Sequence, residues 1–329
     1  MLIDKHNRVH DYLRLSITER CNLRCTYCMP SEGIDLTPKE HIMTNDEILD
    51  FAKIFVDMGI KKIRLTGGEP LVRKDAKEII ERLGQLPIQL AITTNGILLD
   101  RFMDTFKKAG LKSVNVSLDT LDQNKFELIT RRDYFDRVYA NILQYLDAGF
   151  KVKINAVVMK KFNCDEIIRF IDLGQHHNLQ VQFIEFMPFG GNQWDWDKGM
   201  SMQEILDKAY AHYGKTAVQR ISDKANDTGK NYKIAGYKGS FNIISTITEP
   251  FCATCNRIRL TADGKLRNCL LATGEMDLLK PYRKGEDIQP LIVENIQAKA
   301  AERGGWKNFE ELANPDNHSQ NRSMILIGG

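Results

Sequence analysis

Strand and helix patterns alternate along the first two-thirds of the chain, and this alternation constrains the fold more than any other feature. Short runs typical of strands lie at residues 12–18, 62–66, 89–93, 113–118, 152–158 and 180–187. Amphipathic patterns typical of helices lie between them at residues 44–58, 74–83, 98–108, 135–148 and 165–176. Six such repeats predict a parallel sheet, because parallel strands need a crossover connection, usually a helix. An open six-unit barrel and a doubly wound sheet both fit this pattern.

Local signals mark where the predicted helices begin and end. Thr44 followed by Glu47 is typical of a capping box, which opens a helix at residue 45. Four glycines are expected to close helices as left-handed C′ residues: Gly59, Gly84, Gly110 and Gly149.

The predicted strands carry polar side chains on one face. Arg14 and Ser16 alternate with Leu13 and Leu15. The same alternation puts six further residues on the polar face, namely Arg64, Thr66, Asn115, Ser117, Lys153 and Asn155. Parallel strands covered on both faces are normally apolar throughout. We therefore expect this face to line a polar, cationic pocket inside a partial barrel; the alternative is the solvated face of a one-sided sheet.

The character of the chain changes near residue 220. The polar stretch at 222–230 predicts a boundary between a core at 1–222 and a C-terminal region at 223–329. Strand-like runs follow at 231–235 and 239–247, then a hairpin whose strands, 257–260 and 265–271, flank an Asp263–Gly264 turn. A further, late helix is expected around residues 290–303.

Composition sets the broad class. The 329 residues suit one large α/β domain with a smaller one, and the net charge of only +3 does not predict a nucleic-acid partner. No apolar run has transmembrane length, and the first residues lack the apolar segment of a signal peptide. We therefore expect a cytoplasmic protein with no membrane partner, as a monomer or homodimer.

Three cysteines, Cys21, Cys25 and Cys28, form a C-x3-C-x2-C triplet. Structural zinc usually has four protein ligands, whereas three thiolates on a [4Fe–4S] cluster leave one iron open to a small molecule. This spacing, with Tyr27 before the last cysteine, resembles the signature of the radical S-adenosylmethionine (SAM) enzymes. A zinc knuckle is the alternative. Seven cysteines, an odd number, argue against a disulfide framework.

A second triplet is formed by Cys252, Cys255 and Cys269, and again lacks a fourth ligand nearby. Two incomplete triplets predict two clusters, each with an open iron; zinc completed by a histidine is the alternative. Cys164, the one remaining cysteine, is expected to be a lone thiol.

A glycine-rich turn and a group of basic side chains also point to ligand binding. A Gly67-Gly68-Glu69-Pro70 turn ends the second strand, where glycines allow a ligand to approach the backbone closely. It resembles the site at which radical SAM enzymes hold the amino group of SAM. Basic side chains on the polar face and after Cys255 predict a polyanionic substrate, because guanidinium groups bind phosphates in a bidentate manner.

Together these residues resemble the GTP 3′,8-cyclase family of molybdenum cofactor biosynthesis over essentially the whole chain. The resemblance rests on Arg14, the two triplets, Tyr27, residues 64–70, 93–96, 115–119, 153–155, 185–187 and 251–259, and the terminal Gly328 and Gly329. It implies a partial (β/α)6 barrel of the radical SAM type with a C-terminal α+β extension. It also implies two [4Fe–4S] clusters, with SAM on the first and the guanine of GTP on the second.

In that family a 5′-deoxyadenosyl radical, formed from SAM with an electron from an external donor, abstracts the C3′ hydrogen of GTP. The ribose then attacks C8, and a cyclic pyranopterin monophosphate synthase takes the product onward. The resemblance assigns SAM contacts to Tyr27, Gly68, Ser117 and Met187. It assigns GTP contacts to Arg14, Arg64, Thr93, Lys153, Arg257, Ile258 and Arg259, and a catalytic role to Arg257, Arg259, Gly328 and Gly329.

Two alternatives remain open at this point. A radical SAM peptide-maturing enzyme also carries additional clusters, and a zinc-stabilised nucleic-acid-binding module has clustered cysteines. The C-terminal tail makes its own prediction: the apolar run before Gly328 is expected to be a strand that anchors the tail, so that the glycines reach a narrow gap beside a ligand.

Overall fold

The chain folds around one curved sheet, and the computed structural model describes residues 1–29, 33–189, 192, 196–314, 317 and 322–328. The twelve strands of this sheet follow the order β14-β13-β12-β3-β4-β5-β6-β7-β8-β11-β10-β9. Their bounds are β3 Tyr12–Ser16, β4 Lys62–Thr66, β5 Gln89–Thr94, β6 Ser113–Ser117, β7 Lys151–Val158, β8 Gln180–Glu185, β9 Val218–Arg220, β10 Lys230–Ile234, β11 Ser240–Ile244, β12 Arg257–Leu260, β13 Lys265–Arg267 and β14 Met276–Asp277. A separate hairpin pairs β1 (Leu2–Ile3) with β2 (Val9–His10).

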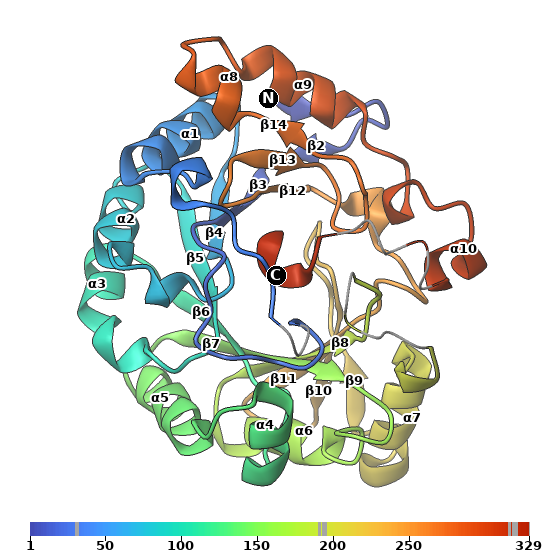
Figure 1. Cartoon of the computed structure of the whole chain (residues 1–329). Helices are drawn as coiled ribbons and strands as arrows, with labels where there is room; N and C mark the ends of the chain where they lie inside the picture. The colour runs from blue at the N-terminus through green and yellow to red at the C-terminus, as the bar shows by residue number, and fades with distance from the viewer. Residues whose placement is uncertain (30–32, 190–191, 193–195, 315–316, 318–321, 329) are drawn as a thin grey trace.

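All six predicted βα strands pair in parallel and in chain order, from β3 to β8. Two strands from the C-terminal region extend this parallel set, β12 beside β3 and β11 beside β8. The predicted core and C-terminal region therefore share one sheet. The sheet bends around a central space with its helices outside, as an open barrel does and a doubly wound sheet does not (Figure 1).

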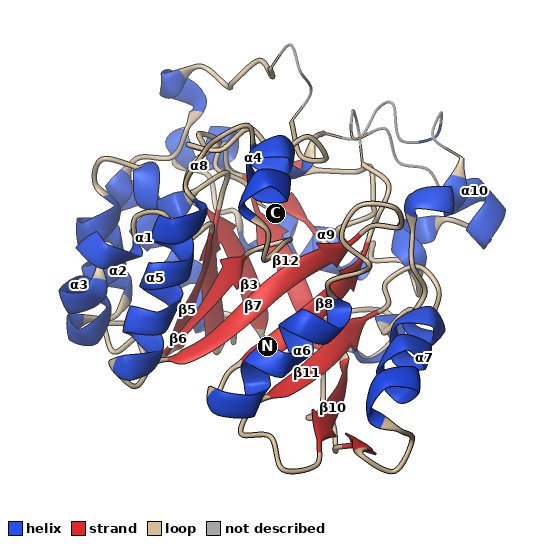
Figure 2. Cartoon of the chain, turned by 90° about the horizontal axis from the view of Figure 1, so that it is seen from below, coloured by secondary structure: helices blue, strands red, loops and turns tan. Residues whose placement is uncertain are grey.

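The helices stand along the outer side of the strands (Figures 1 and 2). Their bounds are α1 Asn45–Asp57, α2 Ala76–Leu83, α3 Met103–Lys108, α4 Gln123–Thr130, α5 Phe135–Asp147, α6 Ile167–His176, α7 Met202–Tyr213, α8 Leu279–Arg283, α9 Gln289–Gln297 and α10 Phe309–Ala313. Short 3-10 turns are η1 Lys39–His41, η2 Pro70–Val72, η3 Leu99–Arg101, η4 Trp196–Lys198, η5 Cys252–Thr254, η6 Arg303–Gly305 and η8 Met324–Leu326.

The expected signals form these helices. Thr44 and Glu47 make the reciprocal capping box at the start of α1, whose buried side chains recur with helical spacing at Ile48, Phe51, Ala52 and Phe55. Those side chains cover the apolar face of the strands, where Leu13 and Ile63 are fully buried. The polar face is thereby left to line the inside of the barrel.

Several expectations were wrong in detail. Gly84 ends α2 with a right-handed φ of −63°, and its lack of a side chain serves packing instead, since a Cβ there would lie 2.7 Å from Ala109 Cα. The helix expected at 98–108 is divided into η3 and α3, and the helix expected around 290–303 is α9, which ends at Gln297. Four of the described helices were not predicted, α4, α7, α8 and α10, although Ser201 and Glu204 form a capping box at the start of α7.

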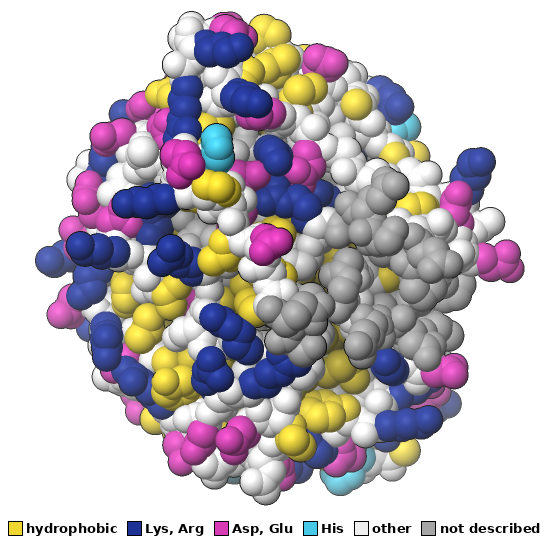
Figure 3. Space-filling model, in the orientation of Figure 1, with side chains coloured by type: hydrophobic (Ala, Val, Ile, Leu, Met, Phe, Trp, Pro, Cys, Tyr) yellow, Lys and Arg dark blue, Asp and Glu magenta, His cyan; other side chains and the backbone are white. Residues whose placement is uncertain are grey.

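The surface agrees with the low net charge. Basic and acidic side chains are interspersed over the face shown in Figure 3. Within the described ranges, no helix combines the length and the apolarity that a bilayer crossing would need.

Candidate functional site

The first cysteine triplet lies in the loop that follows β3, at the carboxyl end of the sheet. The loop is fixed against α4 by backbone bonds from Arg24 N to Thr130 O (3.0 Å) and from Thr26 N to Ile129 O (2.8 Å). It turns within itself through a 3.0 Å bond from Cys28 N to Cys25 O. The three cysteines are thus presented by one short, anchored loop.

The three thiols lie in one another's electrostatic field. Burial, followed by Cys28, Asp119 and Cys21, raises the pKa of Cys25 well above its usual value. Burial and Cys21 raise the pKa of Cys28 to about 12, although an N–H from Ile325 bonds its sulfur. Metal coordination would deprotonate such thiols outright, so this three-thiol set fits an iron–sulfur cluster. Among the described residues, no three His, Cys, Asp or Glu side chains are grouped as the ligands of one ion would be.

The second triplet lies at the opposite end of the barrel. Cys252 and Cys255 immediately precede β12, whose amino end lies beside the amino end of β3, and Cys269 follows β13. Cys269 and Cys255 both add to burial in raising the pKa of Cys252, so these thiols also share one environment.

A lysine distinguishes this second group. Lys299 is almost fully buried, and its Nζ lies 3.6 Å from Cys255 Sγ and 2.8 Å from the carbonyl oxygen of Arg257. Burial acts to raise the pKa of Cys255, but Lys299 and its other partners outweigh burial and lower that pKa. Lys299 therefore makes the thiolate of Cys255 easier to form than burial alone would allow.

The Gly67–Gly68 turn packs directly on the loop of the first triplet. Added Cβ atoms would lie 2.5 Å from Thr18 O at Gly67 and 2.6 Å from Arg20 O at Gly68, so both positions exclude a side chain. Gly68 N and Glu69 N donate backbone bonds of 2.8 Å to Thr18 and Arg20. The motif expected to hold SAM thus borders the first triplet.

Glu69 has a structural role in this turn. Its carboxylate is buried and accepts bonds from Asn95 N (2.6 Å), Thr94 Oγ1 (2.8 Å) and Leu71 N (3.0 Å). Burial raises its pKa to about 7, and these donors act in the opposite direction. The side chain ties the ends of two neighbouring strands together.

The remaining predicted SAM residues lie at or beyond the carboxyl ends of their strands. Tyr27 donates a 2.8 Å bond to Asp119, a buried carboxyl just beyond β6 whose pKa burial raises to about 6. Ser117 is half-buried at the end of β6, and Met187 is half-buried after β8. These positions share one end of the barrel with Gly68 and the first triplet.

Three arginines stand side by side across three neighbouring strands. Arg259 of β12 is in register with Arg14 of β3, and Arg14 is in register with Arg64 of β4. Burial, helped by Arg64 and Arg257, lowers the pKa of Arg14 to about 10, although Tyr12 acts in the opposite direction. Burial and Arg14 lower the pKa of Arg259 well below its usual value. Like charges placed side by side repel one another, and an anion bound among them relieves that repulsion, so the row fits a polyanionic ligand.

Lys153 and Thr93 flank this row. Lys153 on β7 is in register with Asn115 on β6. Burial and then Arg64 lower the pKa of Lys153 to about 8. Thr93 Oγ1 accepts a 3.4 Å bond from Arg64, whose Nη1 also donates to Ile92 O at 2.9 Å. By register Lys153 lies level with Thr93, two residues beyond Arg64 toward the carboxyl ends of the strands, and Arg257 lies two residues nearer the amino end of β12 than Arg259.

Ile258 lies on the other face of β12 from the two arginines that flank it. Its side chain is fully buried in the apolar core, in register with Leu13. Any contact of this position with a ligand in the barrel has to come from its backbone.

The C-terminal tail enters the barrel, as the position of the C-terminus in Figure 1 shows. The carbonyl oxygen of Gly328 accepts bonds from Arg259 Nη1 (2.8 Å) and Arg14 Nη2 (3.5 Å). Gly328 has a φ of +74°, and a Cβ there would lie 2.8 Å from Thr66 Oγ1 and 3.0 Å from Ser16 Cβ. Gly329 lies outside the described residues.

The tail is anchored differently from the prediction. The apolar run before Gly328 forms the 3-10 turn η8 and not a strand. Ile327 is buried in a small apolar cluster with Phe189, Ile247, Leu271 and Leu312. Apolar packing therefore still holds the tail to the body of the protein.

Sequence reasoning missed Tyr12, which lies inside the site. Its hydroxyl accepts a 2.5 Å bond from Arg64 Nε, and Arg257 lies 5.5 Å from its ring centroid. Burial opposes its ionisation, but Arg64, Arg14 and Lys62 outweigh burial and lower its pKa to about 7. The signal was present, because Tyr12 alternates with Leu13 on the same face as Arg14.

The sequence of the chain matches two family models and several known proteins. Residues 15–174 match the model of the radical SAM superfamily, and residues 179–304 match the model described as Molybdenum Cofactor Synthesis C. A mitochondrial GTP 3′,8-cyclase of Arabidopsis thaliana is 45% identical over all of this chain and 84% of its own length. A GTP 3′,8-cyclase of Thermodesulfovibrio yellowstonii is 46% identical over 90% of this chain and 94% of its own.

Human molybdenum cofactor biosynthesis protein 1 is 42% identical, and the chain spans about half of that relative (51%). Among solved structures, Streptococcus suis SuiB bound to S-adenosylmethionine superposes with a TM-score of 0.61 at 17% identity, covering 90% of this chain and 70% of SuiB. At that identity the likeness concerns the fold, and it supports the radical SAM type of partial barrel. Taken with the two cysteine triplets and the lumenal arginines, these matches show that the chain belongs to the GTP 3′,8-cyclase family of the radical SAM superfamily.

Proposed function

We propose that this chain converts GTP to (8S)-3′,8-cyclo-7,8-dihydroguanosine 5′-triphosphate, the first step of molybdenum cofactor biosynthesis. The relatives named GTP 3′,8-cyclase support this activity. The structural observation that carries it is the row of Arg259, Arg14 and Arg64 in register across three strands, between the two cysteine triplets. A triphosphate is a substrate group that three adjacent guanidinium groups suit.

Cys21, Cys25 and Cys28 would hold a [4Fe–4S] cluster whose open iron binds SAM. A cluster held by these three cysteines would supply the electron for the reductive cleavage of SAM. Gly68 brings its backbone to the ligand, and Tyr27, Ser117 and Met187 surround the same end of the barrel. The buried hydrogen bonds of Glu69 and Asp119 keep these strand ends in fixed positions.

Cys252, Cys255 and Cys269 would hold a second [4Fe–4S] cluster that binds the guanine. This count of two rests on the two separate triplets at opposite ends of the barrel. GTP would then lie lengthwise in the barrel, with its base toward the amino end of β12 and its ribose toward SAM. Lys153, Thr93 and the arginine row line the space between.

Arg257 and Arg259 would orient the reacting nucleotide, and the Gly328–Gly329 tail would share this catalytic task. The carbonyl oxygen of Gly328 accepts hydrogen bonds from two arginines of the row, Arg259 and Arg14, which supports a role for the tail beside the substrate. We also propose a functional division, with the SAM cluster in 1–222 and the substrate cluster in 223–329. An external one-electron donor, a synthase that takes the product and a cytoplasmic setting complete the proposal.

The test is an anaerobic assay of reconstituted protein with SAM, a reductant and GTP. We expect GTP-dependent formation of 5′-deoxyadenosine together with a cyclised nucleotide triphosphate. Formation of 5′-deoxyadenosine with no cyclised nucleotide from GTP would refute the proposed substrate.

A further inference from the structure

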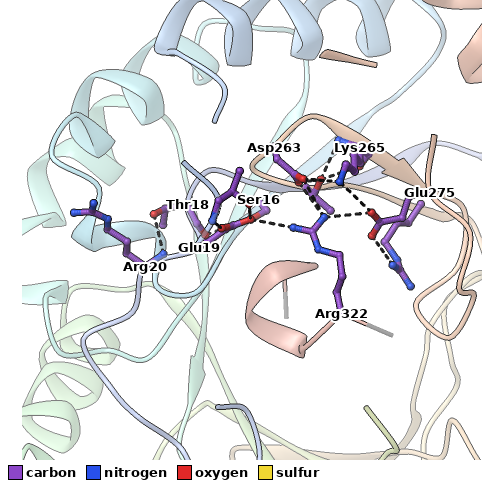
Figure 4. Close-up of polar contacts among 11 residues, drawn as sticks. Ser16, Thr18, Glu19, Arg20, Asp263, Lys265, Glu275 and Arg322 are labelled. Atoms are coloured by element: carbon purple, nitrogen blue, oxygen red, sulfur yellow. Dashed lines mark hydrogen bonds and ion pairs between the residues drawn. The ribbon is translucent and has the colours of Figure 1, made fainter. Parts of the chain in front are cut away.

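The guanidinium of Arg322 contacts three carboxylates that belong to separate parts of the chain (Figure 4). Its Nη2 lies 3.0 Å from Glu19 Oε1, and its Nη1 lies 3.1 Å from Asp263 Oδ1 and 3.3 Å from Glu275 Oε2. Arg322 lies just ahead of η8 and Gly328, at the beginning of the segment that enters the barrel. Nothing in the sequence analysis or in the family resemblance singled out this arginine.

Each of the three acids belongs to an element that bears on the proposed site. Glu19 lies in the loop between β3 and Cys21, and its carbonyl oxygen would lie 2.8 Å from a Cβ at Gly68. Asp263 lies in the turn after β12, the strand of Arg257 and Arg259. Glu275 directly precedes β14 at the end of the sheet. Arg322 therefore joins the start of the tail to the loop of the first triplet and to the hairpin of β12.

Of the three carboxylates that Arg322 contacts, Glu19 depends on it most. Asp263 and Glu275 have other cations, since Lys265 lies 3.1 Å from Asp263 and Arg267 lies 2.6 Å from Glu275. For Glu19, in the part of the chain that the structure describes, Arg322 is the one cation within ion-pair distance. The Glu19 carboxylate otherwise accepts bonds from Thr37 N and Oγ1 at 2.8 and 2.9 Å. Loss of Arg322 would leave a buried carboxylate without its cation.

We propose that Arg322 is a positioning residue that seats the C-terminal tail in the barrel. The tail is held at its far end by Arg259 and by the burial of Ile327, and Arg322 holds its near end to the loop of the first triplet. A segment fixed at both ends has far fewer conformations to lose when it takes part in a reaction. The catalytic consequence rests on the proposed function, whereas the seating itself does not.

Hydrogen exchange measured by mass spectrometry tests the seating in the full, cluster-loaded chain. Arg322→Gln should speed exchange in peptides that cover residues 323–328 by about tenfold or more, with exchange in β3–β8 unchanged. Arg322→Lys, which keeps the charge but loses the forked geometry, should give a smaller increase, and it is the variant to measure if Arg322→Gln fails to fold. The matched control is Arg283→Gln. Arg283 forms an ion pair with Glu47, with 2.6 Å between Nε and Oε1, and neither residue belongs to the tail. Tail exchange equal to that of the unmodified chain, in whichever Arg322 variant folds, would overturn the proposal.

A second measurement tests the consequence for the reaction. In Arg322→Gln, cleavage of SAM in the presence of GTP should persist, while the cyclised nucleotide formed per 5′-deoxyadenosine should fall about tenfold or more. An unchanged ratio with a loosened tail would overturn the positioning role. If the unmodified chain itself forms no cyclised nucleotide, the proposed function fails, and the exchange experiment still decides the seating.

Discussion

Arg259 donates a 2.8 Å hydrogen bond to the carbonyl oxygen of Gly328, although the two residues lie 69 positions apart in the chain. This bond brings the C-terminal tail to a side chain that the sequence pattern had assigned to a polyanionic substrate. The tail and the proposed triphosphate site are therefore neighbours, and the tail is placed to influence the reaction of the bound nucleotide.

Gly328→Ala tests the tail directly. The substitution adds a Cβ at a φ of +74°, 2.8 Å from Thr66 Oγ1, so the tail either moves or stores about 1–3 kcal/mol of strain. We expect both clusters and GTP affinity to be retained and cyclisation to collapse. Gly285→Ala is the matched control, because Gly285 has a similar φ of +78° but no atom within 4 Å of the added Cβ. Normal turnover by Gly328→Ala would show that the tail is only an end of the chain.

The two triplets should have separable roles. Replacement of Cys21, Cys25 and Cys28 by alanine should abolish reductive cleavage of SAM, since these thiols lie beside the Gly67–Gly68 turn. Replacement of Cys252, Cys255 and Cys269 should leave some cleavage and stop cyclisation. Iron content and product formation are the measurements. Cyclisation at the normal rate by the second variant would contradict the role of the second cluster.

Lys153→Met should weaken GTP binding by roughly 1.5–3 kcal/mol, the range for a charge-assisted bond, and should leave guanosine binding nearly unchanged. Lys151→Met is the control, because Lys151 begins the same strand and is exposed. Arg64→Ala should have an effect of similar size, but Arg64 also bonds Tyr12 and Ile92, so Lys153 gives the cleaner comparison. Equal losses of GTP and guanosine affinity, measured by calorimetry, would indicate a structural role for Lys153.

GTP affinity should depend on pH through the same lysine. Burial and Arg64 lower the pKa of Lys153 to about 8, so the free protein loses this positive charge as the pH rises through 8. A bound triphosphate favours the charged form, and linkage then requires affinity to fall above pH 8, by at most about tenfold per pH unit for one proton. Titrations at pH 7, 8 and 9 should show this fall in the unmodified chain and a flatter profile in Lys153→Met. Identical profiles would exclude Lys153 as the titrating group.

Much of this site could be predicted from the sequence, because the strand period fixes which side chains share a face. The alternation of Leu13 with Arg14 was enough to send the arginine into the barrel, and the same rule would have found Tyr12. The rule also places Ile258 in the apolar core, which the family resemblance alone did not reveal.

The parts that escaped prediction depend on contacts between distant segments. Nothing local marks Arg322 as a partner of Glu19 or Lys299 as a neighbour of Cys255, because these pairs form only when the C-terminal region joins the sheet at β12. The tail shows the limit in another way: an apolar run at its end fits a strand as well as a 3-10 turn, and its tertiary setting selected the turn.

The most direct test of the central claim uses GTP that carries deuterium at C3′. Reconstituted protein is supplied with SAM and a reductant, and the 5′-deoxyadenosine and the nucleotide product are analysed by mass spectrometry. The account predicts deuterium in the 5′-deoxyadenosine and a cyclised triphosphate that has lost it from C3′. Formation of 5′-deoxyadenosine without deuterium, together with unchanged GTP, would contradict the account.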